Sequence, residues 1–173
     1  CFMLFYGMAA AVAIAVSYFR GKGRITDARN VALSGLHLTW MMGTLLAVAI
    51  FALRHQVGAW FTHDAAVTAM VASLTIPLCL YQYGDAMQCI FANALRGMAD
   101  VKPMVWIAFI AYFLVSLPLG YLFGFPCHWG VTGVWWAFPF GLTTAGMLYM
   151  LRFMHSTRTG QPAPHGEEET HAV

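Results

Sequence analysis

Long apolar runs separated by short charged segments make up most of this 173-residue chain. A helix that crosses a bilayer needs roughly 20 mostly apolar residues. Five runs qualify, at about residues 2–19, 31–53, 67–95, 104–125 and 131–151. The pattern predicts an all-α fold: a polytopic membrane helix bundle with five transmembrane helices.

The composition agrees with this prediction and excludes several classes of protein. Hydrophobic residues make up 60% of the chain and charged residues 9%, whereas soluble domains have about 45–50% and about 25%. A soluble fold this apolar could not cover itself with polar surface. We find no glycine-rich phosphate loop, nucleophile triad or nucleic-acid motif. We therefore expect a membrane protein that is not an enzyme and does not bind nucleic acid.

The basic residues are distributed unevenly between the two sides of the predicted bundle. Only Arg54 follows an even-numbered run. The other eight follow odd-numbered runs and are Arg20, Lys22, Arg24, Arg29, Arg96, Lys102, Arg152 and Arg158. Since cytoplasmic loops carry the excess of Lys and Arg, we expect this side and the C-terminus to be cytoplasmic. The expected location is a bacterial inner (plasma) membrane, with the chain crossing it several times.

The two ends of the chain differ in character. Cys1 already lies inside an apolar run, which we interpret as a truncation, so that an N-terminal part of the same chain is missing. Residues 155–173 contain two prolines and three consecutive glutamates but little that could be buried. We expect these residues to form a disordered cytoplasmic tail.

Neither cysteine nor histidine spacing indicates a metal site. No two of the four cysteines form a C-x-x-C pair, and the seven histidines are scattered. We expect no metal and no cofactor.

Small residues recur every four positions in two runs, a spacing that lets membrane helices approach closely. They are Gly7, Ala11 and Ala15 in the first run, and Gly133, Ala137, Gly141 and Ala145 in the fifth.

Asp85 is the one carboxylate inside a predicted span. A charge at the centre of a membrane helix costs about 2.5–3.5 kcal/mol on insertion scales, so its environment must offset that cost. Tyr81, Gln82 and Gln88 lie three or four residues away, on the same side of the helix. One interpretation is a cation- or proton-binding site formed by these four residues. The other is a hydrogen-bonded aspartate that only fixes helix packing.

Pro77 lies two helical turns before Asp85 and leaves the carbonyl group of Ser73 without its usual donor. Transporters use such interruptions as hinges. Proline is also common in membrane helices for packing alone, so a hinge at Pro77 and a packing role both remain open.

The third run and the loop after it resemble the tenth helix of the multidrug and toxic compound extrusion (MATE) transporters. Residues 82–88 contain the acidic position, and residues 95–100 match a Leu-Arg-Gly turn that ends in an acidic residue. Residues 21–29 resemble the family's loop between helices eight and nine, and residues 130–135 resemble the start of helix twelve. The resemblance covers about residues 2–154.

The resemblance implies an antiporter of two six-helix lobes that exports amphipathic organic compounds against sodium or protons. Residues 1–154 would then be the five-helix part of the C-terminal lobe, an incomplete six-helix lobe. Asp85 matches the carboxylate of the cation site in that lobe, and Arg96 and Asp100 belong to a cytoplasmic loop. The implied partners are a small-molecule substrate, the lipid bilayer and the missing N-terminal part.

Two other functions remain open from the sequence. A flippase for lipid-linked saccharides has a related fold, but such proteins tend to place basic residues within their helices, and no Lys or Arg here lies in the middle of a run. A membrane subunit that scaffolds partners without transporting anything would tolerate replacement of Asp85.

Overall fold

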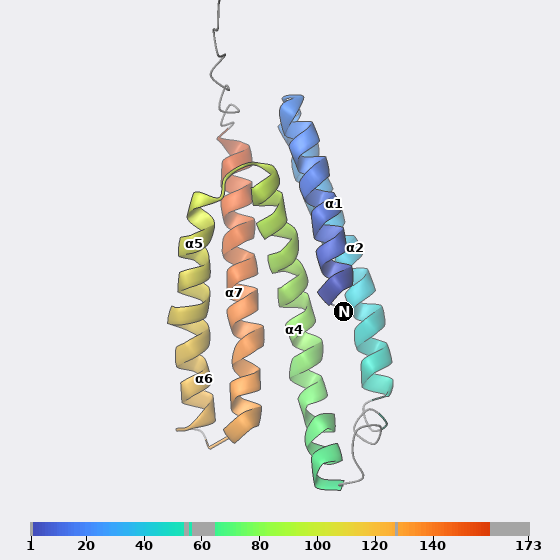
Figure 1. Ribbon diagram of the computed structural model, residues 1–173, viewed down its shortest axis with the longest axis vertical. Helices are drawn as coiled ribbons and strands as arrows, with labels where there is room; N and C mark the ends of the chain where they lie inside the picture. The colour runs from blue at the N-terminus through green and yellow to red at the C-terminus, as the bar shows by residue number, and fades with distance from the viewer. Residues whose placement is uncertain (1, 54–55, 57–64, 127, 160–173) are drawn as a thin grey trace, which may run out of the picture.

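The computed structural model describes residues 2–53, 56, 65–126 and 128–159, and all its regular elements are helices. The elements are α1 (Phe2–Gly21), α2 (Ile25–Ala52), α4 (Ala65–Gly97), α5 (Lys102–Phe109), the π-helix η1 (Ile110–Ser116), α6 (Leu117–Gly124) and α7 (Gly130–Arg158). Because α5, η1 and α6 follow one another directly, they form one rod. Figure 1 shows α4 between the α1–α2 pair and the pair formed by this rod and α7. The predicted all-α bundle is confirmed.

The helices extend beyond the predicted apolar runs. The second run was expected to begin at residue 31, but α2 begins at Ile25, and α7 continues through Arg158 rather than ending near 151. Hydropathy marks only the part of a helix suited to lipid, and a helix can continue with charged residues at either end. Residues 155–158 of the predicted tail are therefore helical, while residues 160–173 lie outside the described residues.

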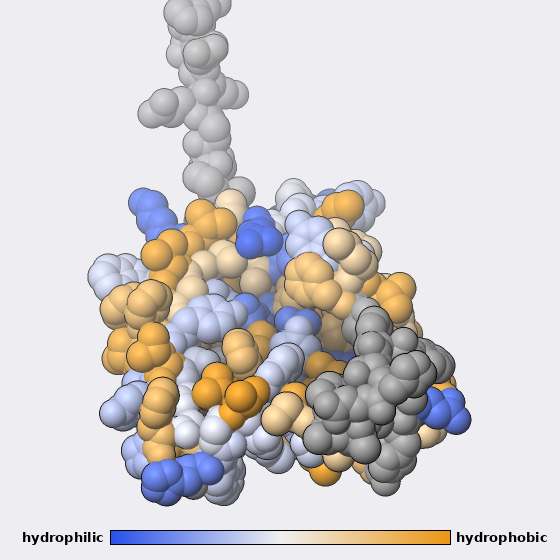
Figure 2. Space-filling model, turned by 60° about the horizontal axis from the view of Figure 1, so that its bottom comes forward, coloured by the Kyte–Doolittle hydropathy of each residue, from blue (hydrophilic) through white to orange (hydrophobic). Residues whose placement is uncertain are grey.

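Among the described residues, four helical segments are long and apolar enough to cross a membrane: Phe2–Gly21, Ile25–Ala52, Lys102–Gly124 and Gly130–Arg158. The span predicted at 67–95 is the helix α4, 33 residues long, which is not among these four. Large apolar side chains of α5 face outward: Val105 is 72% exposed and Trp106 is 70% exposed. Hydrophobic side chains cover much of the outer surface in Figure 2, as expected for a surface in contact with lipid.

The eight basic residues that follow odd-numbered apolar runs gather at one end of the bundle, which we call the basic end. They do so because α1, α4 and α7 finish there, whereas α2 and α5 start there (Figure 1). Arg54 lies outside the described residues.

Helices α1 and α4 finish at the basic end in similar turns. Asp100 N–H donates to the carbonyl of Leu95 (3.0 Å), and Ala99 N–H donates to that of Arg96 (2.9 Å). Ala99 has a φ of 54°, so an alanine takes the left-handed position that glycine usually occupies in this cap. At the end of α1 the same position is held by Gly23, with a φ of 71°.

The predicted close packing of small residues is confirmed in α7 and stays a prediction for α1. All four members of the α7 series are buried. In α1, a Cβ atom added to Gly7 would meet nothing within 4 Å, and Ala11 is exposed. The buried face of α1 consists instead of larger residues: Phe5, Ala9, Val12 and Val16. Apolar volume rather than small size decides which side of α1 meets α2 and α4.

Candidate functional site

Asp85 is buried on α4, with 6% of its surface exposed. Two side chains of the same helix donate to its carboxylate: the Tyr81 hydroxyl at 3.5 Å and the Cys89 thiol at 3.8 Å. The Tyr81 distance is long for an O–H donor to a charged oxygen, which is normally below 3 Å, and a thiol is a weak donor. Among the described residues, no Lys or Arg is paired with this carboxylate.

Two glutamines beside Asp85 also have unused polar atoms. Gln82 is 2% exposed, and neither its Nε2 nor its Oε1 has a hydrogen-bond partner among the described residues. In Gln88, Oε1 is likewise unpaired, whereas Nε2 donates to the Tyr112 hydroxyl at 2.5 Å. An unpaired buried polar group costs about 1–3 kcal/mol. Unpaired amide atoms therefore lie one helical turn before and one turn after the buried carboxylate.

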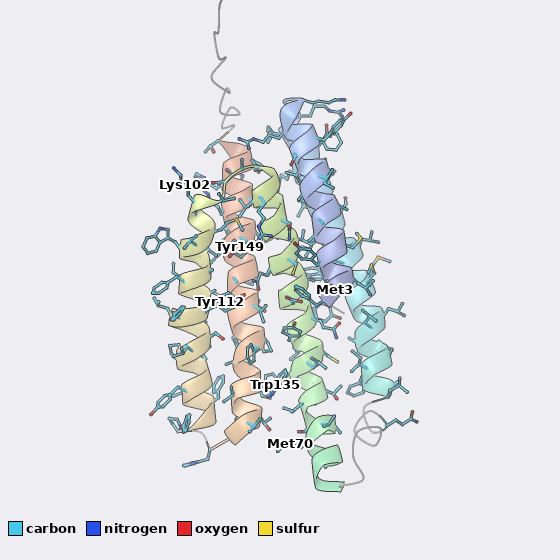
Figure 3. All side chains as sticks on the ribbon, in the orientation of Figure 1. Met3, Met70, Lys102, Tyr112, Trp135 and Tyr149 are labelled. Atoms are coloured by element: carbon cyan, nitrogen blue, oxygen red, sulfur yellow. The ribbon has the colours of Figure 1, made fainter. Side chains whose placement is uncertain are left out.

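Tyr112 was not among the residues predicted from the sequence. It lies in η1, about half way along the rod (Figure 3), and π-helical turns occur often at functional sites. The fourth run carries polar side chains at four-residue spacing, Tyr112 and Ser116, and this spacing was the available signal. It does not reveal that Tyr112 faces α4.

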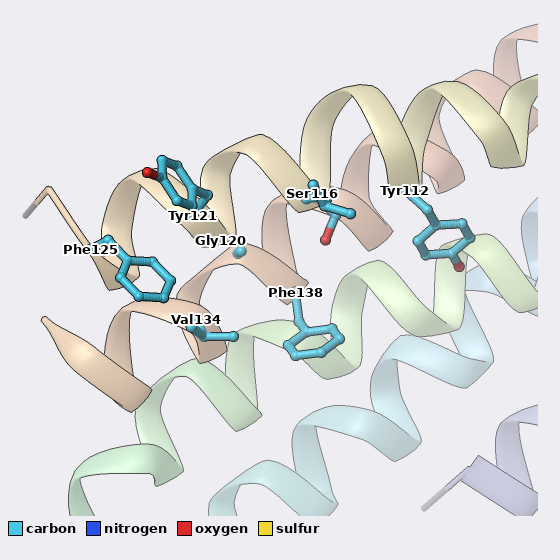
Figure 4. Close-up of a pocket in the computed structure, with 9 residues that line it drawn as sticks. Tyr112, Ser116, Gly120, Tyr121, Phe125, Val134 and Phe138 are labelled. Carbon is cyan, nitrogen blue, oxygen red and sulfur yellow. The ribbon is translucent and has the colours of Figure 1, made fainter.

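A groove of about 410 Å³ runs between the rod and α7, and Tyr112 lies at one end of it (Figure 4). Apart from Tyr112, Ser116 and Tyr121, the lining is apolar or glycine, and includes Phe125, Val134 and Phe138. In Figure 4 the Tyr112 hydroxyl is directed toward α4. Tyr112 thus connects an apolar groove with the polar residues around Asp85.

Close contact between α4 and α7 fixes the position of Asp85. A Cβ atom on Gly84 would lie 2.9 Å from the backbone nitrogen of Thr143, and one on Gly146 would lie 3.0 Å from the backbone nitrogen of Gln88. Glycine is therefore needed at both positions for the backbones to approach this closely. The two contacts lie on either side of Asp85 along α4.

Pro77 is fully buried, and α4 continues through it without interruption from Ala65 to Gly97. The predicted hinge at Pro77 therefore stays a prediction.

Asp100 lies in the turn after α4 and joins it to the end of α7. Arg152 donates to both carboxylate oxygens, from Nε at 2.8 Å and from a terminal nitrogen at 3.1 Å, and the Ser156 hydroxyl donates at 3.1 Å. We call these three residues the Asp100 clasp. Arg96, predicted for the same loop, is exposed in the last turn of α4 and contacts Asn93 at 3.4 Å. No sequence pattern indicated that Arg152 is the partner of Asp100.

The clasp determines the charge state of Asp100. Burial alone raises the pKa of this carboxyl group. The hydrogen bonds from Arg152 and Ser156, together with the positive charges of Arg152 and Arg20, outweigh burial and hold the pKa below its ordinary value. Asp100 is thus a charged structural residue, in contrast to the sparsely bonded Asp85.

Comparison with known proteins identifies the family. Residues 1–122, more than two thirds of the chain, match the sequence pattern of the MatE family. The chain belongs to the MatE family of membrane transporters. This matched region contains α1, α2, α4 and Asp85, together with the Asp100 turn.

Two solved transporters have the same fold. The eukaryotic MATE transporter AtDTX14 is 20% identical, with a TM-score of 0.81, over 92% of this chain and 37% of that one. A multidrug resistance MATE family transporter of the MOP superfamily, in an inward-facing conformation, is 16% identical, with a TM-score of 0.82, over 94% of this chain and 39% of that one. The chain therefore spans about two fifths of the length of these MATE transporters.

Proposed function

We propose that this MatE chain is part of the C-terminal lobe of a secondary active transporter. It would export drugs or other amphipathic organic compounds in exchange for inward-moving sodium ions or protons, which bind at Asp85. One observation carries the proposal: the buried carboxylate of Asp85 lies beside the buried amide of Gln82, whose two polar atoms have no hydrogen-bond partner among the described residues, and near Gln88 Oε1, which also has none. A coupling site needs a buried group that binds the driving ion, and a carboxylate can bind either a proton or a sodium ion.

The four residues proposed for the site have different roles. Asp85 supplies the negative charge. Gln82 and Gln88 offer amide oxygens, which are suitable ligands for a hard cation such as sodium, and Tyr81 hydrogen-bonds the carboxylate when no cation is bound. A proton needs the carboxylate alone. Loss of the Gln82 oxygen would therefore weaken coupling more in a sodium-driven transporter than in a proton-driven one.

We also propose that the basic end faces the cytoplasm of a bacterium, which places the C-terminus inside. Support comes from the gathering of eight Lys and Arg residues at this end. A cysteine introduced at Lys102 should resist an impermeant thiol reagent in intact cells, and one at His128 should react. The opposite labelling pattern would reverse the orientation.

Asp85→Asn tests the proposed site. The substitution keeps the size of the side chain but removes the titratable charge. In the full-length transporter, reconstituted in proteoliposomes with an imposed sodium or pH gradient, we expect export to fall below about a tenth of the parental rate. Membrane insertion should remain near normal. Asp27→Asn is the matched control, since Asp27 lies at the basic end, paired with Arg24.

The same experiment separates the alternatives. If Asp85→Asn exports at the parental rate with unchanged dependence on sodium and pH, Asp85 only fixes helix packing and the proposed site is wrong. A scaffold subunit would show no gradient-driven export in the parent, in Asp85→Asn or in Asp27→Asn. A flippase for lipid-linked saccharides would move such a lipid rather than an amphipathic drug.

A further inference from the structure

A second concave site lies at the basic end, away from Asp85. It is a groove of about 640 Å³ between the start of α2 and the end of α7, which we call the basic groove. Its lining consists of four basic or titratable side chains and two apolar ones: Arg29, Arg152, His155, Arg158, Leu151 and Met154.

The positive charge in the basic groove is only partly used by the protein. Arg152 is paired with Asp100 in the clasp. Among the described residues, Arg29 and Arg158 take part in no ion pair, and no carboxylate lines the groove. Positive charges on two different helices repel each other, and an anion bound between them offsets this repulsion. The planar guanidinium groups of arginine favour phosphate oxygens, which they can bind in pairs.

The apolar part of the lining limits which anion fits. Leu151 is 60% exposed and Met154 is half-buried, and both precede the charged turn of α7 that contains His155 and Arg158. On α7, Leu151 therefore lies farther from the basic end than His155 and Arg158, with Arg152 next to Leu151. A free phosphate ion would leave the apolar part unused. A phospholipid has the same order of groups, with a phosphate at the surface and acyl chains below it.

We propose that the basic groove binds the phosphate of an anionic phospholipid, with Arg29 and Arg158 as its main ligands and an acyl chain along Leu151. Basic pockets between membrane helices bind such headgroups. The bound lipid would join the start of α2 to the end of α7, two helices that otherwise make few contacts. This site is independent of the transport proposed at Asp85.

The test compares a double variant, Arg29→Gln with Arg158→Gln, with a charge-matched control, Lys22→Gln with Lys102→Gln. The control removes two positive charges from the same end but from outside the groove. Binding of short-chain dihexanoyl phosphatidylglycerol to the full-length protein in detergent is measured by native mass spectrometry and thermal shift. Dihexanoyl phosphatidylcholine and inorganic phosphate are the comparison ligands.

We expect about thirtyfold weaker binding of phosphatidylglycerol by the groove variant and less than a threefold change in the control. Each basic residue near an anionic lipid contributes about 1 kcal/mol, or about fivefold. Folding of the groove variant is checked by its unfolding temperature without lipid. Equal losses in both variants would show bulk surface charge rather than a site. Phosphate binding as tight as that of the lipid would overturn the lipid assignment. Lipid binding that appears only after residues 160–173 are removed would also overturn it, because the occupant of the groove would then be this acidic segment.

Discussion

Replacement of Asp100 by asparagine would test whether the clasp holds α4 to α7. The Asp100 side chain is 14% exposed and that of Arg152 is 31% exposed. Exposed ion pairs contribute about 0.2–1 kcal/mol, whereas loss of one partner from a fully buried pair costs about 3–5 kcal/mol. The clasp lies between these limits. We therefore expect Asp100→Asn to lower the free energy of unfolding by about 2 kcal/mol.

The assay is unfolding in detergent, followed by tryptophan fluorescence, for Asp100→Asn, Arg152→Gln and the double variant. The cycle isolates the interaction between the two residues, and we expect a coupling energy above about 1 kcal/mol. Asp27→Asn is the control because its ion pair with Arg24 is more exposed, at 33% and 60%. It should cost less than about 0.5 kcal/mol. Equal losses for the two aspartates, or zero coupling, would refute the reasoning.

The pH dependence of this effect has a definite sign. Because the pKa of Asp100 in the folded protein lies below its ordinary value, the clasp stabilises fully above the unfolded-state pKa, near 4. This stabilisation is lost as the pH falls through the lower, folded-state pKa. The difference in stability between parent and Asp100→Asn should therefore be constant near neutral pH and shrink below about pH 4. A difference that vanished between pH 6 and 8 would point to another titrating group.

Two further predictions concern the residues around Asp85. Gly84→Ala should lower the free energy of unfolding by about 1–2 kcal/mol because its Cβ would meet the backbone of Thr143. Gly7→Ala, whose Cβ would lie in open space, should be neutral or stabilising in the same unfolding assay. Equal effects of the two substitutions would contradict the close α4–α7 contact. Tyr112→Phe removes the acceptor of Gln88 Nε2 and should lower gradient-driven export about fivefold, with Tyr121→Phe, in the same groove, as the control. Equal transport by both tyrosine variants would show that the bond to Gln88 has no part in coupling.

The sequence allowed prediction of those features that have a local physical signal. A buried charge is costly in lipid, which made Asp85 conspicuous. No helix end was predicted at Gly23, although glycine is the usual residue at such a left-handed position. The equivalent turn after α4 uses Ala99, so composition alone does not show its conformation. Its location followed instead from the family resemblance of the surrounding residues.

Contacts between distant segments could not be predicted in the same way. Gln88 and Tyr112 are separated by 24 positions, and Asp100 and Arg152 by 52. A membrane helix is apolar on all sides, so its periodicity does not tell which side meets a neighbour. For the same reason the small residues of α1 did not show which of its faces meets α2 and α4. The π-helical turn has no sequence signature, so the direction in which Tyr112 points, toward α4, could not be predicted.

The π-helix η1 has a consequence for how this rod can change during evolution. A π-helical turn holds one residue more than an α-helical turn, so deleting one residue from 110–116 could restore an ordinary α-helix while α5 and α6 keep their orientations. The same deletion in α7 would turn everything beyond it by about 100° and break its series of small residues. Single-residue length variation among relatives should therefore be tolerated in the middle of the rod and rare within α7.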